Sequence, residues 1–133
     1  MTLFRKMVAG LGVAVLVAAS PALAFETVPY TPAALAEAKA AGQPFVLDFF
    51  ASWCTTCKAQ ERVIDGLIEQ NPAYGEITYM RVNWDEEERG PLVAEMGIPR
   101  RSTLVVLKGE TELGRIVAGT GKDEIAALLN LAL

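Results

Sequence analysis

Histidine is absent from this chain of 133 residues, and cysteine occurs only twice. The absence of histidine excludes His-assisted catalysis and every metal site that needs an imidazole ligand. Lysine and arginine are also outnumbered, with 12 against 16 aspartate and glutamate residues. An acidic chain without a basic patch argues against nucleic acids and anionic membrane surfaces as partners. The sequence also has no internal repeat and no low-complexity tract.

The first 24 residues predict an export signal. Arg5 and Lys6 precede an uncharged apolar run over residues 7–19, and residues 20–24 end in an Ala-x-Ala cleavage pattern. The run has about 13 residues, fewer than the roughly 20 that span a bilayer, so an uncleaved anchor is the less favoured alternative. Cleavage after Ala24 leaves residues 25–133, a length that suits one small domain. Without Arg5 and Lys6 the basic residues fall from 12 to 10 against 16 acidic ones, a net charge of −6.

The apolar periodicity of residues 25–133 predicts alternating helices and strands. Residues 45–50 are almost uniformly apolar, as in a strand buried on both faces, and only Asp48 interrupts them. Residues 25–30 are expected to be an extended lead, residues 85–88 a solvated acidic turn, and Gly66 a weak point or bend in its helix. The expected helices are 33–41, 54–70, 91–96 and one around 125–129, and the expected strands are 45–50, 77–83, 103–107 and 113–118. This order predicts an α/β fold, with a central mixed sheet of about four to five strands and helices on both faces.

The two cysteines, Cys54 and Cys57, stand two residues apart where the apolar strand passes into a helical pattern. The N-terminus of a helix favours a thiolate, so Cys54 is the expected nucleophile. Cys57 follows one helical turn later, where it can resolve a mixed disulfide by attacking Cys54. A purely structural disulfide is the alternative. Closing so short a loop removes little chain entropy, roughly 2 kcal/mol, which favours a redox role.

The run Trp53-Cys54-Thr55-Thr56-Cys57-Lys58 resembles the active-site segment of the thioredoxin family. Asp48, the strand end at residues 81–85 and the stretch 97–109 extend this resemblance over nearly all of residues 31–133. The preceding helix and Gln43-Pro44-Phe45 are more similar to the C-terminal periplasmic domain of the thiol–disulfide interchange protein DsbD. The resemblance implies a thioredoxin-like domain over residues 25–133 and a redox-active Cys54–Cys57 disulfide, without a metal or another cofactor.

Together with the predicted export signal, the resemblance implies an exported, periplasmic reductase of protein disulfides. We expect the protein to be a monomer. Its electrons are expected from a membrane thiol donor of the DsbD or CcdA type. The uncharged Thr55-Thr56 pair and the missing histidine favour a reducing couple. An oxidase or isomerase is the nearest alternative, and a module that binds copper, another soft metal or a cluster through the two thiols is a more distant one.

Four further residues take candidate roles from the resemblance. Asp48 matches an acid that lies beneath the second cysteine and shuttles its proton, and Arg81 stands where relatives often have lysine. A structural Asp48–Arg81 pair is the alternative. Lys58 adds positive charge near the thiolates or is simply solvated. Trp53 covers the site and contacts partners, or it packs in the core.

One position departs from the thioredoxin pattern. Relatives usually carry a cis-proline directly before the strand that begins here at Thr103, but this chain has Ser102 there, and Pro99 lies three residues earlier. Either a remodelled loop brings Pro99 to the site, or Ser102 itself faces the disulfide. If Ser102 occupies the usual position of the cis-proline, restoring proline there is expected to be tolerated. Arg100 and Arg101 form a small basic cluster beside this position, which contacts an acidic partner or is solvated.

Overall fold

The computed structural model describes residues 25–133, so the predicted export signal lies outside the described residues. The strands are β1 (Thr27–Pro29), β2 (Phe45–Phe50), β3 (Thr78–Asn83), β4 (Thr103–Lys108) and β5 (Thr111–Val117). The α-helices are α1 (Pro32–Ala41), α2 (Thr55–Gln70), α3 (Trp84–Glu87), α4 (Pro91–Met96) and α5 (Lys122–Asn130), and Pro72–Glu76 forms a 3-10 helix. Within residues 25–133, no helix is both long and apolar enough to span a membrane.

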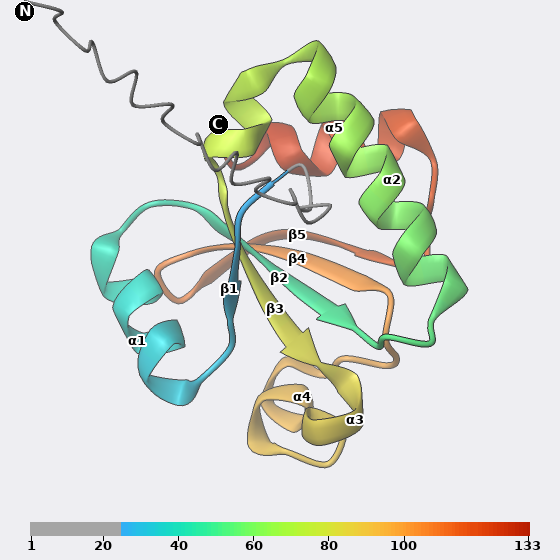
Figure 1. The fold of residues 1–133 in the computed structure, drawn as a ribbon. Coiled ribbons are helices and arrows are strands. Elements are labelled where there is room, and N and C mark those ends of the chain that lie inside the picture. Colours follow the sequence, from blue (N-terminus) through green and yellow to red (C-terminus); the bar gives the residue numbers. More distant parts are fainter. Residues whose placement is uncertain (1–24) are drawn as a thin grey trace, which may run out of the picture.

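The five strands form one mixed sheet in the order β1-β3-β2-β4-β5 (Figure 1). β1, β2 and β3 run parallel, whereas β4 is antiparallel to both β2 and β5. β2 lies at the centre of the sheet, and its register sets Asp48 opposite Arg81 of β3 and Leu104 of β4. The expected mixed sheet with helices on both faces is confirmed.

Each face of the sheet has its own apolar core. Val46 of β2 packs with Ile64 of α2 and Ile125 of α5 on one face. Leu47 packs with Leu35 of α1 and Leu92 of α4 on the other face. Figure 1 shows α2 and α5 on one side of the sheet and α1 and α4 on the other. Successive strand residues point to opposite faces, so Asp48 lies on the same face as Val46, beneath α2. A carboxyl group is thereby carried into the layer that α2 covers.

The local sequence explains where the main helices begin and end. Thr31 caps α1 by accepting the backbone N–H of Ala34 at 3.0 Å, Pro32 occupies its first turn, and Gly42 ends it with φ 72°. α2 runs without interruption through Gly66, so this glycine does not end the helix. Burial of the apolar stripe of α2 against the sheet outweighs the roughly 1 kcal/mol that glycine costs in a helix.

Two shorter segments are more ordered than the sequence suggests. The expected extended lead contains β1, which pairs in parallel with β3. The expected acidic turn is wrong, because the helix α3 begins at Trp84 and includes Asp85. The Asn83 side chain caps it by accepting the backbone N–H of Asp85 at 3.1 Å, and acidic residues in a first turn are favourable to the helix dipole.

Candidate active site

Cys54 and Cys57 form a disulfide at the start of α2. Cys54 is the N-cap residue, and its Sγ accepts the backbone N–H of Cys57 at 3.1 Å. A sulfur atom thus takes the place of the oxygen that usually caps a helix. This helix start is where the sequence predicts a thiolate. Both cysteines are only 2% exposed and pack with Ala51, Phe50 and Trp84. Cys54 is therefore less accessible than the sequence interpretation expects.

Ser102 faces the disulfide from the loop before β4. Its Oγ lies 3.1 Å from Sγ of Cys54 and 3.2 Å from Sγ of Cys57. The serine is fully buried, whereas Pro99 is exposed. Between the two expected alternatives, the structure places Ser102 at the disulfide and leaves Pro99 outside it.

The backbone of Ser102 is held in a left-handed conformation with φ 61°. No peptide bond within residues 25–133 is cis. The backbone N–H of Ser102 donates to the carbonyl of Phe49 at 2.7 Å. Proline fixes φ near −65° and has no N–H, so the expectation that proline is tolerated at Ser102 is wrong for this loop.

Gln60 of α2 ties this loop to the helix, and the sequence interpretation missed it. Its Nε2 donates to the carbonyl of Ser102 at 3.0 Å and to that of Gly119 at 2.9 Å, while its side chain is almost fully buried. The N–H of Ala118 donates to the same Ser102 carbonyl at 2.8 Å. A buried glutamine among the apolar positions of the helix 54–70 is the signal that could have pointed to this role.

Asp48 is 4% exposed and lies in the interior of the sheet. Burial raises the pKa of its carboxyl group from 3.8 to about 6, against the opposing attraction of Arg81. The nearby Glu61 carboxylate also raises the pKa of Asp48. A carboxyl group with a pKa near neutrality can accept and return a proton under physiological conditions.

Arg81 is shared between three neighbours. Its Nε lies 3.3 Å from Oδ2 of Asp48, its Nη2 donates to Oε1 of Glu61 on α2, and its Cζ lies 3.7 Å above the ring of Phe50. The predicted Asp48–Arg81 proximity is present, and Glu61 is an addition the sequence interpretation missed. Because Glu61 also binds the guanidinium group, the positive charge of Arg81 is shared between two carboxyl groups, those of Asp48 and Glu61.

Trp53 forms the exposed rim of the site. Its side chain is 54% exposed, so the alternative of simple core packing is wrong. Its Nε1 donates to both carboxylate oxygens of Asp85, at 3.0 and 3.1 Å, and the guanidinium of Arg101 lies 4.2 Å above its ring. The sequence alone does not indicate a function for Asp85. Lys58 is exposed on α2.

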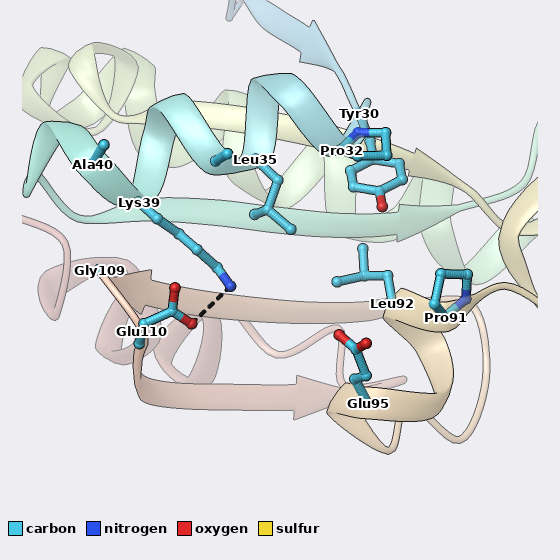
Figure 2. Close-up of a pocket in the computed structure, with 11 residues that line it drawn as sticks. Tyr30, Pro32, Leu35, Lys39, Ala40, Pro91, Leu92, Glu95, Gly109 and Glu110 are labelled. Carbon is cyan, nitrogen blue, oxygen red and sulfur yellow. Dashed lines mark hydrogen bonds and ion pairs between the residues drawn. The ribbon is translucent and has the colours of Figure 1, made fainter.

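One surface hollow lies away from the cysteines, between α1 and α4 (Figure 2). It measures about 520 Å³, and Leu35 and Leu92 line it. The ion pair between Lys39 and Glu110, at 2.9 Å, borders it. None of its lining residues belongs to the disulfide site.

A mixed sheet between two helical layers, with a Cys-x-x-C disulfide at a helix start and a buried acid beneath that helix, defines a dithiol–disulfide oxidoreductase. The thioredoxin family model matches residues 27–131. The chain therefore belongs to the thioredoxin family and is a protein-disulfide oxidoreductase.

Individual relatives agree with this assignment. Thioredoxin H2-1 of Oryza sativa is 33% identical over 64% of this chain, and the matched region spans 57% of that protein. Thioredoxin 1 of Nostoc sp. is 29% identical over 65% of this chain and 77% of its own length. Among solved structures, Trxlp from Edwardsiella tarda superposes with a TM-score of 0.66 at 28% identity, over 78% of this chain and 98% of that one.

Proposed function

We propose that this protein is an exported, periplasmic reductase of protein disulfides. The observation that carries the proposal is the Cys54–Cys57 disulfide at the N-terminus of α2, with the buried Asp48 carboxyl group on the sheet face that α2 covers. The uncharged Thr55-Thr56 dipeptide and the absence of histidine in the sequence support a reducing couple.

The reaction follows from the positions of the two sulfurs. In the reduced protein, the Cys54 thiolate attacks a substrate disulfide; one new S–S bond forms, and the departing substrate sulfur leaves as a thiolate that takes a proton from water. Cys57 then loses its proton and attacks Cys54, which restores the disulfide of the protein. The second substrate sulfur leaves with the electron pair, so the substrate gains two electrons and the protein loses two.

Asp48 is the proposed acceptor of the Cys57 proton. It lies on the sheet face covered by α2, which carries Cys57, and its pKa of about 6 allows the transfer near neutral pH. The alternative is a carboxyl group that only pairs with Arg81. A slower decay of the mixed disulfide in Asp48→Asn supports the transfer, and an unchanged decay supports the pairing alone.

Electrons must be returned to the protein after each turnover. We propose a membrane thiol donor of the DsbD or CcdA type, on the basis of the expected export and of the resemblance to DsbD expected from residues 33–45; the relatives found by comparison are thioredoxins. The Cys57→Ser variant tests this idea, because it cannot resolve mixed disulfides and so retains its partners. A mixed disulfide with a membrane thiol protein is the expected result, and its absence when soluble substrates are captured would contradict the donor.

Export is tested separately. Residues 1–24 fused to alkaline phosphatase, which is active only after export, should give activity in a Gram-negative host. Replacing Arg5 and Lys6 by glutamate in the same fusion is the control and should reduce export. The mature protein is expected to begin at Phe25 and to be a monomer by light scattering. A chain that retains residue 1 would show that the signal is not cleaved.

Catalysis is tested with insulin as substrate and a small dithiol as electron source. The wild-type protein should accelerate reduction of the insulin disulfides, and Cys54→Ser should not. Metal content of the protein purified under reducing conditions tests the alternative of a soft-metal module. Stoichiometric copper or iron together with no insulin reduction would favour that alternative.

A further inference from the structure

Ser102 brings a hydroxyl group to both reacting sulfurs. Its Oγ lies 3.1 Å from Cys54 Sγ and 3.2 Å from Cys57 Sγ. A hydroxyl group has one proton to donate and two lone pairs to accept with. It can therefore donate to a thiolate on one sulfur while it accepts the S–H of the other.

The surroundings make such a hydrogen bond stronger than it is in water. Ser102 is 0% exposed, and Cys54 and Cys57 are each 2% exposed. Water therefore has little access to the sulfurs and cannot readily replace the Ser102 hydroxyl group as their hydrogen-bond partner. In an interior of low dielectric constant, a hydrogen bond to a charged group is stronger than one between neutral groups.

The loop holds the hydroxyl group in place at some cost. The left-handed φ of 61° costs a residue with a Cβ roughly 1–2 kcal/mol. Three hydrogen bonds oppose that cost. The Ser102 N–H donates to the carbonyl of Phe49, and the Ser102 carbonyl accepts from Gln60 Nε2 and from the N–H of Ala118. Backbone strain that neighbours over-determine is found most often at functional sites.

We infer that the Ser102 hydroxyl group is a catalytic hydrogen-bond donor that follows the negative charge between the two sulfurs. It donates to the Cys54 thiolate in the reduced protein and accepts from the Cys57 thiol. Once Cys54 is bonded to the substrate, its sulfur carries no charge, and the hydroxyl group turns to donate to the Cys57 thiolate. Ser102 itself is neither oxidised nor covalently changed.

This inference rests on the proposed dithiol–disulfide chemistry, and two variants test it. Ser102→Ala removes the hydroxyl group, and Ser102→Gly removes it while easing the left-handed backbone. Ser52→Ala is the matched control, because Ser52 is an exposed serine two residues before Cys54. Thermal unfolding of the oxidised proteins checks that each variant is folded, and the glycine variant is expected to remain folded even where alanine is strained.

The first measurement is ultraviolet absorbance of the Cys54 thiolate as a function of pH. Both Ser102 variants should raise the pKa of Cys54 by about one unit, a tenfold change in the thiol–thiolate equilibrium. At a pH above the pKa of Cys54 in both the wild type and the variant, the equilibrium with glutathione should move about tenfold towards the protein disulfide. This change corresponds to about 30 mV. Ser52→Ala should match the wild type.

The second measurement is the release of thionitrobenzoate from its disulfide dimer. The first equivalent reports attack by Cys54, and the second reports resolution by Cys57, which should slow about tenfold in both Ser102 variants. Values within twofold of wild type in both measurements would overturn the inference. A wild-type protein that neither equilibrates with glutathione nor releases thionitrobenzoate would instead contradict the proposed function.

Discussion

The disulfide has two unlike sides. On the α2 side, Cys54 caps the helix and its sulfur accepts a backbone N–H from Cys57. On the sheet side, side chains act instead: the Ser102 hydroxyl group touches both sulfurs, and the Asp48 carboxyl group lies buried in the sheet beneath α2. Backbone groups are available to any Cys-x-x-C at a helix start, whereas the side chains depend on this particular sequence. The α2 side therefore contributes a backbone contact to the site, and the sheet side contributes buried side chains.

The largest expected effect comes from breaking the α2 side. Cys54→Ser should lower the rate of insulin reduction by at least about a thousandfold, because serine is not ionised near neutral pH and a thiolate is the attacking group. Cys57→Ser is the paired control. It should still attack substrate once and accumulate the mixed disulfide on a non-reducing gel, and measurable turnover by Cys54→Ser would remove Cys54 from the nucleophile's role.

The next effect comes from removing the buried charge on the sheet side. Burial raises the pKa of Asp48 from 3.8 to about 6, so ionisation above pH 6 costs the folded protein about 3 kcal/mol at 1.36 kcal/mol per pKa unit. Asp48→Asn mimics the protonated form and should stabilise the oxidised protein by about that amount at pH 7.5. The pKa is raised on folding, so the contribution of Asp48 is fully favourable below pH 3.8 and is lost as the pH rises to about 6.

Urea unfolding at several pH values measures this difference. The gain of Asp48→Asn should shrink as the pH falls and vanish near pH 3.5, where the wild-type carboxyl group is protonated in both states. Glu69→Gln, an exposed acid on α2, should show no such dependence. If Asp48→Asn raised the free energy of unfolding equally at pH 3.5 and pH 7.5, burial would not raise the pKa of Asp48 on folding.

A smaller effect is expected from loosening the link between the two sides. Gln60→Ala removes the amide donor to the carbonyls of the buried Ser102 and the half-buried Gly119, which should cost about 2 kcal/mol of unfolding free energy. Gln70→Ala, at an exposed position of the same helix, is the matched control. If both variants unfold at the same urea concentration, α2 does not hold the Ser102 loop through Gln60.

The smallest effect belongs to the exposed rim. Asp85→Asn weakens the hydrogen bonds that orient the Trp53 indole group, and an exposed contact of this kind contributes about 1 kcal/mol or less. The kcat/KM for insulin should fall about twofold to fivefold, with a changed Trp53 emission in a Trp84→Phe background. An unchanged emission would show that Asp85 does not orient Trp53 in solution.

The sequence predicts the α2 side much better than the sheet side. The buried strand, the Cys-x-x-C spacing and the helix start are local patterns, and Cys54 occupies the expected cap. Gln60 lies 42 residues from Ser102, and Trp53 lies 32 residues from Asp85, so no local pattern reports those contacts. The sequence leaves open whether Ser102 or Pro99 faces the disulfide, because only the fold decides how the loop before β4 turns. The left-handed backbone places the hydroxyl group of Ser102, and a serine in the sequence does not indicate such a conformation.

The reduction potential of the Cys54–Cys57 couple tests the central claim most directly. Equilibration of the folded protein, residues 25–133, with glutathione or a dithiol buffer measures it. A reductase with an uncharged dipeptide between its cysteines should lie at about −200 to −270 mV, in the range of thioredoxin and glutaredoxins. A value near −120 mV, as in the strong oxidant DsbA, would contradict the reductase assignment and make the protein an oxidase.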